Sequence, residues 1–164
     1  MGLQLPGELR AVLSLIGYEW PQADEQKLFE MGQVWTRFAG TIQHSIAEAD
    51  PVAAAVWTQN VGADITAFRA SWEHEDGPSK ALHDGATAAQ LAGLGLMVCG
   101  LIVLALKVAV IIQLVILAIE IAQAIATSEL TFGASLLEIP VFQQLTRTVV
   151  SNLLMEALFM LADG

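Results

Sequence analysis

Hydrophobic side chains recur at helical spacing along the first half of the chain. From residue 24 onward, apolar residues alternate at intervals of three and four positions, while charged residues fall elsewhere. This pattern predicts a long amphipathic helix with Asp24 as a candidate N-cap and Glu25 in its first turn. Its apolar stripe consists of Leu28, Met31, Trp35, Phe38, Ile42 and Ala49. A short helix is expected before it, over residues 9–16.

A second apolar stripe follows the first and ends at a strong turn signal. It consists of Val61, Ile65, Phe68 and Trp72, and Glu75-Asp76-Gly77-Pro78 comes directly after it. Two consecutive helices with apolar stripes bury them most simply as an antiparallel hairpin. The expected fold class is therefore all-α. It is a long antiparallel helical hairpin, extended by apolar helices and closed by a C-terminal amphipathic helix over residues 141–162.

The link between the two stripes has two interpretations. Asp50-Pro51 resembles an N-cap followed by proline at the first helical position, which would start the second helix there. Alternatively the first helix continues past Pro51, and residues 57–62 make the turn, because asparagine and glycine tolerate a left-handed backbone. We favour the second interpretation.

The second half of the chain is far more apolar than the first. Residues 85–119 carry a single charge, that of Lys107, whereas residues 1–84 hold 12 acidic and 5 basic groups. We therefore divide the chain into an N-terminal hairpin region, 1–84, and an apolar helical region, 85–164, that packs on it. The stretches 88–106 and 108–127 are each long enough for a bilayer, which needs about 20 apolar residues. They can form two membrane helices or one continuous helix.

The apolar block has hydrophobic residues on all its sides, so a part of its surface must meet lipid, another copy or a partner helix. We favour protein over lipid, because the charge of Lys107 at the centre of the block is costly in a bilayer. The residues expected to face a partner or a membrane are Leu94, Leu101, Leu104, Ile112, Val115 and Ile119.

Composition and charge exclude several classes of function. The chain is 55% hydrophobic and has a net charge of -10, which repels nucleic acid. Its N-terminus lacks the basic start and apolar core of a general secretory signal peptide. The histidines and acids around residues 73–84 have no spacing that sets two ligands on one helix face, and phosphate loops and nucleophile elbows are absent. We expect no enzyme activity, no metal and no cofactor.

Several sequence blocks resemble a known family. Trp57 followed by Gly62 is similar to the turn of WXG-motif hairpins exported by type VII secretion, although four residues stand between them here and one in those proteins. The fuller resemblance is to the WXG-like N-terminal domains of actinobacterial type VII-secreted toxins, the CpnT-like outer membrane channel and necrotizing toxin type. It rests on residues 5–10, Trp20-Pro21, residues 56–60, residues 75–78 and residues 132–140.

The resemblance implies a non-catalytic export-targeting module that precedes a variable C-terminal toxin, with a membrane-inserting or pore-forming channel domain as the alternative. It implies export by the type VII machinery to the outside or the cell envelope, with small WXG-type helical partners or self-association. The implied motif residues are Trp57, Asn60 and Gly62 at the turn, with Trp72 and Asp76 in the W-x-x-x-D spacing of type VII substrates. One turn of helix would place Trp72 and Asp76 on one face.

Overall fold

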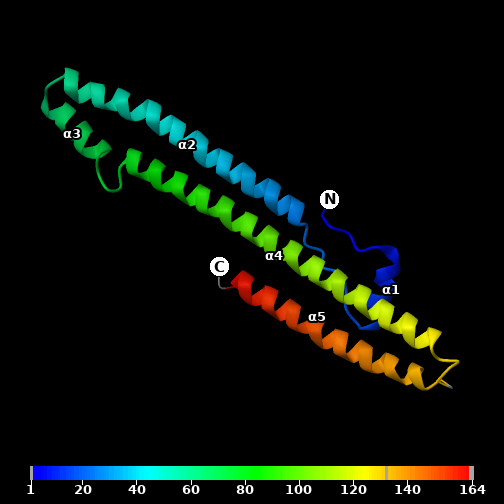
Figure 1. Cartoon of the computed structure of the whole chain (residues 1–164). Helices are drawn as coiled ribbons and strands as arrows, with labels where there is room; N and C mark the ends of the chain where they lie inside the picture. The colour runs from blue at the N-terminus through cyan, green and yellow to red at the C-terminus, as the bar shows by residue number, and fades with distance from the viewer. Residues whose placement is uncertain (1, 132, 163–164) are drawn as a thin grey trace. The chain divides into compact units, whose positions relative to one another are not determined.

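The computed structural model describes residues 2–131 and 133–162, and the regular elements in those ranges are all helical. In chain order they are α1 (Gly7–Leu15), α2 (Glu25–Gln59), α3 (Ala63–Trp72), α4 (Pro78–Ala126), the short 3-10 helix η1 (Ala134–Glu138) and α5 (Ile139–Ala162), as Figure 1 shows. This confirms the predicted all-α class with long helices.

The chain forms two compact units. One, called here the hairpin unit, contains residues 28–98. The other, the apolar unit, combines the chain up to Lys27 with the chain from Cys99 onward. The boundary therefore lies within α4 and not near residue 84, and the N-terminal segment belongs with the C-terminal half.

The hairpin unit consists of most of α2, followed by α3 and the first part of α4, which run back alongside α2 (Figure 1). Helix α2 continues through Pro51 to Gln59, and the chain turns at residues 60–62. This confirms the second interpretation of the link. The returning arm is interrupted at residues 73–77, where the predicted turn signal lies, and then continues as α4.

The two arms of the hairpin pack against each other mainly through small side chains. Within the hairpin unit, the buried residues of α2 are spaced by seven positions and are Gly32, Ala39, Ile46 and Ala53. On α4 the corresponding residues are Ala86, Ala89 and Gly93. A Cβ atom added to Gly32 would lie 2.7 Å from the carbonyl oxygen of Gly93, and one added to Gly93 would lie 2.8 Å from that of Gly32. The two backbones are in contact there, which no residue with a side chain permits.

This close approach corrects the predicted apolar stripe of the first helix. Met31 is 50% exposed, Trp35 41% and Phe38 52%, so these side chains do not fill the space between the arms. Helices that touch through glycine and alanine leave no room for large side chains between them, and the larger residues lie on the flank. Val61 lies before α3 and is 98% exposed, so it is not a member of the second stripe either.

The apolar unit is built around the second part of α4. The helix is continuous from Pro78 to Ala126, which selects the single-helix alternative over two membrane helices joined at Lys107. Its buried residues follow intervals of three and four, with one interval of seven at the end: Gly100, Val103, Lys107, Val110, Leu114, Leu117 and Ala124. Leu5, Leu13 and Ile16 from the N-terminal segment and Val150 from α5 form one core with this side of α4.

Helix α5 lies alongside this part of α4 and is covered on one side only (Figure 1). Thr146, Val150 and Ala157 are its buried residues, and Phe142 packs against the core. Leu145 and Phe159 do not contribute to this packing. They are 64% and 63% exposed, because they lie on the opposite side of the helix.

Candidate functional site

The tip of the hairpin unit is held by a row of aromatic rings. The ring centroids of Trp57 and Phe68 are 5.9 Å apart, and those of Phe68 and Trp72 are 6.0 Å apart. The guanidinium of Arg69 lies 5.8 Å from the Trp57 ring, a cation–π distance. These contacts join the end of α2 to α3, and they place the predicted turn residue Trp57 against Phe68 and Arg69.

The turn itself uses Asn60 and Gly62. The side-chain amide of Asn60 donates a hydrogen bond of 2.9 Å to the carbonyl of Val56, which satisfies an end carbonyl of α2. Gly62 has φ 156° and ψ 165°, a region that is essentially restricted to glycine. It precedes the first residue of α3 and lets the chain reverse.

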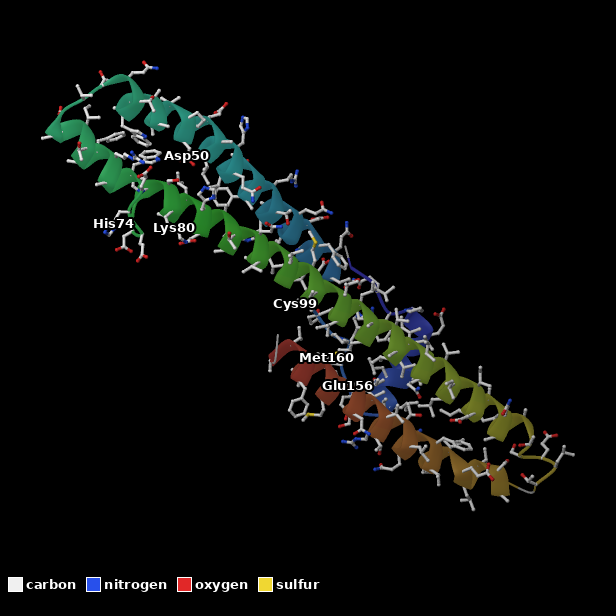
Figure 2. The ribbon with its side chains drawn as sticks, turned by 60° about the vertical axis from the view of Figure 1, so that its left-hand side comes forward. Asp50, His74, Lys80, Cys99, Glu156 and Met160 are labelled. Carbon is white, nitrogen blue, oxygen red and sulfur yellow. The ribbon has the colours of Figure 1, made fainter. Side chains whose placement is uncertain are left out.

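Asp50 joins all three helices of the hairpin unit. Its Oδ1 accepts hydrogen bonds from the Trp72 indole N–H at 3.1 Å and from the Ser79 hydroxyl at 2.9 Å. Its Oδ2 lies 3.8 Å from Nε2 of His83. Figure 2 shows Asp50 on α2 facing the start of α4, with Lys80 and His74 near the interruption of the returning arm. The sequence indicates Asp50 only as a cap candidate, because its partners Trp72, Ser79 and His83 are 22 or more positions away.

Trp72 and Asp76 do not share a helix face, which corrects the predicted geometry. Helix α3 ends at Trp72, and Asp76 lies in the connection that leads to α4. The Trp72 ring is half-buried and held by Asp50, whereas the Asp76 side chain is 97% exposed. The Asp76 backbone N–H donates to Nδ1 of His74 at 3.1 Å, which fixes the connection.

The acids and histidines near residues 73–84 do not converge on a common point. Lys80 forms an ion pair with Asp84, and His83 faces Asp50. Among residues 2–131 and 133–162, no group of at least three His, Cys, Asp or Glu side chains is arranged to hold a metal ion. The Lys80–Asp84 contact lies within α4, and the His83–Asp50 contact joins α4 to α2.

The apolar unit has a buried ion pair that the sequence analysis did not identify. Nζ of Lys107 lies 2.7 Å from Oε2 of Glu25, and the side chains are only 2% and 6% exposed. Lys107 also donates to the Ala23 carbonyl at 2.6 Å, and the Leu3 backbone N–H donates to Oε1 of Glu25. Burial favours a raised pKa for Glu25, but the hydrogen bonds from Leu3 and Lys107 outweigh it and hold the pKa below its ordinary value.

The side of α4 opposite this pair is uncovered in the structure. Large residues on it are half exposed, including five of the residues predicted to face a partner or membrane: Leu94 at 49%, Leu101 at 58%, Ile112 at 51%, Val115 at 40% and Ile119 at 51%, whereas Leu104 is partly buried. Two stretches, α4 and residues 134–162, are long and apolar enough to cross a membrane by length and composition.

A hollow of about 360 Å³ lies between α4 and α5 within the apolar unit. The space is open because Ala105, Ala109 and Ala157 have small side chains. Leu101, Leu153 and Met160 contribute to its walls. Glu156 is its one charged lining residue and stands near Met160 in Figure 2. The lining suits an apolar group.

Comparison with known proteins places these features in a family. The model of the WXG100 like domain matches residues 6–149. No curated protein and no solved structure matches the chain. The matched range contains the hairpin unit and most of the apolar unit, including the Glu25–Lys107 pair. The chain therefore belongs to the WXG100-like domain family, whose members are helical proteins related to type VII secretion.

Proposed function

We propose that this chain is a non-catalytic export-targeting module of a type VII-secreted toxin and that the export machinery recognises its hairpin unit. The family is associated with type VII secretion and with export from the cell. The finer role, which is to carry a C-terminal toxin to the outside or the cell envelope without a general secretory signal, is our proposal. The titratable groups that converge in the structure, at Asp50 and at Lys107, hold helices together, which supports binding over catalysis.

The proposed recognition rests on one observation: the exposed carboxylate of Asp76 follows the anchored side chain of Trp72 at the end of α3. The Trp72 ring is anchored by Asp50, and the Asp76 carboxylate projects from the next connection with 97% of its side chain exposed. A receptor that binds the Asp76 carboxylate would contact it at a defined position, next to the anchored end of the hairpin. Trp72 would then act by positioning the connection more than by direct contact.

The proposal is tested by replacing Asp76 with alanine. Because the side chain is exposed, the Asp76→Ala variant should keep its thermal midpoint, with a change in stability within about 0.5 kcal/mol. Secretion, measured as the ratio of protein in culture filtrate to protein in cells, should fall several-fold. Glu75→Ala removes a neighbouring exposed acid and should export normally. Undiminished export of a folded Asp76→Ala variant would remove Asp76 from the signal.

The flank of α2 provides a surface for a small helical partner of the WXG type. Met31, Val34, Trp35 and Phe38 lie within two helical turns, and each is between 41% and 56% exposed. Their spacing of three, one and three positions places them on one side of α2. A partner helix that covers them would convert the two-helix arrangement of this unit into a bundle. Phe38→Glu should abolish capture of such a partner in co-expression while leaving the hairpin folded.

A second candidate function is membrane insertion, and the apolar unit gives a specific reason for it. The charge of Lys107 is directed to the buried side of α4 and neutralised by Glu25, so it does not oppose contact of the other side with lipid. The purified protein should then float with liposomes and stay bound at high salt. A stable protein that remains off liposomes would contradict insertion and leave the targeting role in place.

A further inference from the structure

The outer side of α5 has a regular, exposed seam. It consists of Val141, Leu145, Thr148, Asn152, Met155 and Phe159, which alternate at intervals of four and three positions, as in a coiled coil. The apolar members are strongly exposed: Val141 is 57%, Leu145 64%, Met155 52% and Phe159 63% exposed. The buried residues of α5, Thr146, Val150 and Ala157, lie on the other side of the helix.

Apolar and polar residues are distributed symmetrically about the midpoint of this seam. The two outer positions at each end are apolar, and the two central positions are polar and uncharged. A bilayer disfavours this arrangement, because Asn152 in the middle of the seam would enter the lipid without a partner. A helix that packs on the seam satisfies Asn152 only if it presents a polar residue at the same level.

Another copy of α5 in the antiparallel direction meets that requirement. Aligning the two midpoints sets Val141 opposite Phe159, Leu145 opposite Met155 and Thr148 opposite Asn152. A shift by one heptad would instead set Asn152 opposite Val141 and Leu145 opposite Thr148. Only the aligned register keeps apolar residues against apolar residues and polar against polar, so the central pair determines the register.

The hydrogen-bonding state of the central residues fits this arrangement. The Thr148 hydroxyl donates to the Gln144 carbonyl at 3.0 Å, which leaves its oxygen able to accept a further bond. The Asn152 amide is exposed and forms no hydrogen bond within the described part of the chain. Its N–H groups can therefore donate to Thr148 of a second copy.

Side-chain size also distinguishes the two directions. An open groove on the surface of α5 borders the first half of the seam and is lined by Pro140, Val141, Gln144, Leu145 and Thr148. In the aligned antiparallel register the large side chains of Phe159 and Met155 from the second copy stand opposite Val141 and Leu145, whereas a parallel arrangement would set Val141 against Val141.

We propose that α5 mediates antiparallel self-association of the chain through this seam, with Thr148 of each copy opposite Asn152 of the other. The helix dipoles also favour the antiparallel direction, because a parallel pair aligns the two dipoles and an antiparallel pair opposes them. The inference does not depend on the export role, because it uses only the geometry of α5.

Cysteine cross-linking tests the direction and the register. In a Cys99→Ser background, Thr148→Cys and Asn152→Cys chains are prepared separately and oxidised under mild conditions, alone and as a mixture. The mixture should give a disulfide-linked dimer, and each variant alone should give little. Efficient cross-linking of either variant by itself would indicate a parallel pair and overturn the proposal. No cross-link in any sample would overturn it as well.

Light scattering after size exclusion tests the seam itself. Leu145→Asp should weaken dimerisation by about tenfold or more, because it buries a charge against Met155. Leu145 is exposed within one copy, so the variant should retain its helical content. Leu130→Asp is the matched control, since Leu130 is 82% exposed and lies outside the seam, and it should dimerise normally. A wild-type protein that stays monomeric, or that leaves solution for liposomes, would refute the proposal.

Discussion

Removing one member of the Glu25–Lys107 pair should destabilise the apolar unit strongly. In a Lys107→Met variant the Glu25 carboxylate remains about as buried as it is now, at 6% exposure, and keeps only the hydrogen bond from Leu3. Breaking a buried pair in this way costs about 3–5 kcal/mol, because a charge is left without compensation. That is a large part of the stability of an ordinary domain, which is about 5–15 kcal/mol.

The double variant Glu25→Gln/Lys107→Met isolates the contribution of the ion pair itself to stability. Glutamine retains an oxygen that accepts from the Leu3 N–H, and methionine fills the volume of the lysine stem on the buried side of α4. No charge then remains buried, so we expect the double variant to lie within about 1 kcal/mol of the wild type. The difference between the double variant and the sum of the single variants is the coupling energy of the pair.

Urea unfolding followed by circular dichroism measures these quantities. With a slope of about 2 kcal/mol per molar urea, the Lys107→Met loss corresponds to a midpoint lower by about 1.5–2.5 M. Glu25→Gln should show a loss of similar size, because it leaves the ammonium buried without a counter-ion, beside the Ala23 carbonyl and the Trp20 ring. Losses below about 1 kcal/mol in both single variants, or additive losses in the double variant, would show that the pair is not a closed, desolvated contact.

The remaining predictions concern packing and pH. Gly93→Ala should lower stability by about 1–3 kcal/mol in thermal unfolding, because its Cβ would contact the Gly32 carbonyl. Gly95→Ala is the control, since the space around Gly95 is open and alanine there should be neutral or stabilising. Equal effects of the two variants would contradict the backbone contact. The stability difference between wild type and Glu25→Gln should be constant above about pH 5, because the pKa of Glu25 is lowered in the folded state, and should shrink as the pH falls below about 4.5; a difference that grows in acid would reverse this assignment. Phe68→Ala should cost about 1–2 kcal/mol and weaken the near-ultraviolet signal of the tryptophans, since Phe68 stands between both rings and is 39% exposed; an unchanged spectrum would place the rings elsewhere.

Helix positions and turns were accessible from the sequence because their signals are local. The continuation of α2 past Pro51, the turn at residues 60–62 and the interruption at residues 73–77 all depend on neighbouring residues. The exposed residues of α4 were also predictable, because a helix with apolar residues on every side cannot bury them all.

The buried side of α2 was not accessible in the same way. Hydrophobicity favours Met31 and Phe38, yet Gly32 and Ala39 are the buried residues. Small residues carry little hydrophobic signal, and their value appears only when a second helix approaches closely. The geometry of Asp76 was missed because helix ends depend on the surrounding contacts, and α3 ends at Trp72, where Asp50 holds the ring.

The partner of Lys107 could not be predicted from local pattern. A lone lysine in an apolar run indicates that some compensating group is needed, but not which of the many acids supplies it. Glu25 looked like an ordinary acid in the first turn of a helix. Only the three-dimensional arrangement shows that its carboxylate turns away from water to meet Lys107.

The separation of Glu25 and Lys107 along the chain affects the order in which the protein can fold during its synthesis. The two residues are 82 positions apart, and a ribosome adds about 5–20 residues per second, so Glu25 waits roughly 4–16 seconds for its counter-ion to be made. Residues 28–98 form one uninterrupted stretch, so the hairpin unit needs no residue that is made after Val98. The N-terminal segment depends on later residues, and until the second part of α4 emerges its Leu5, Leu13 and Ile16 have no core to enter and stay exposed on the nascent chain.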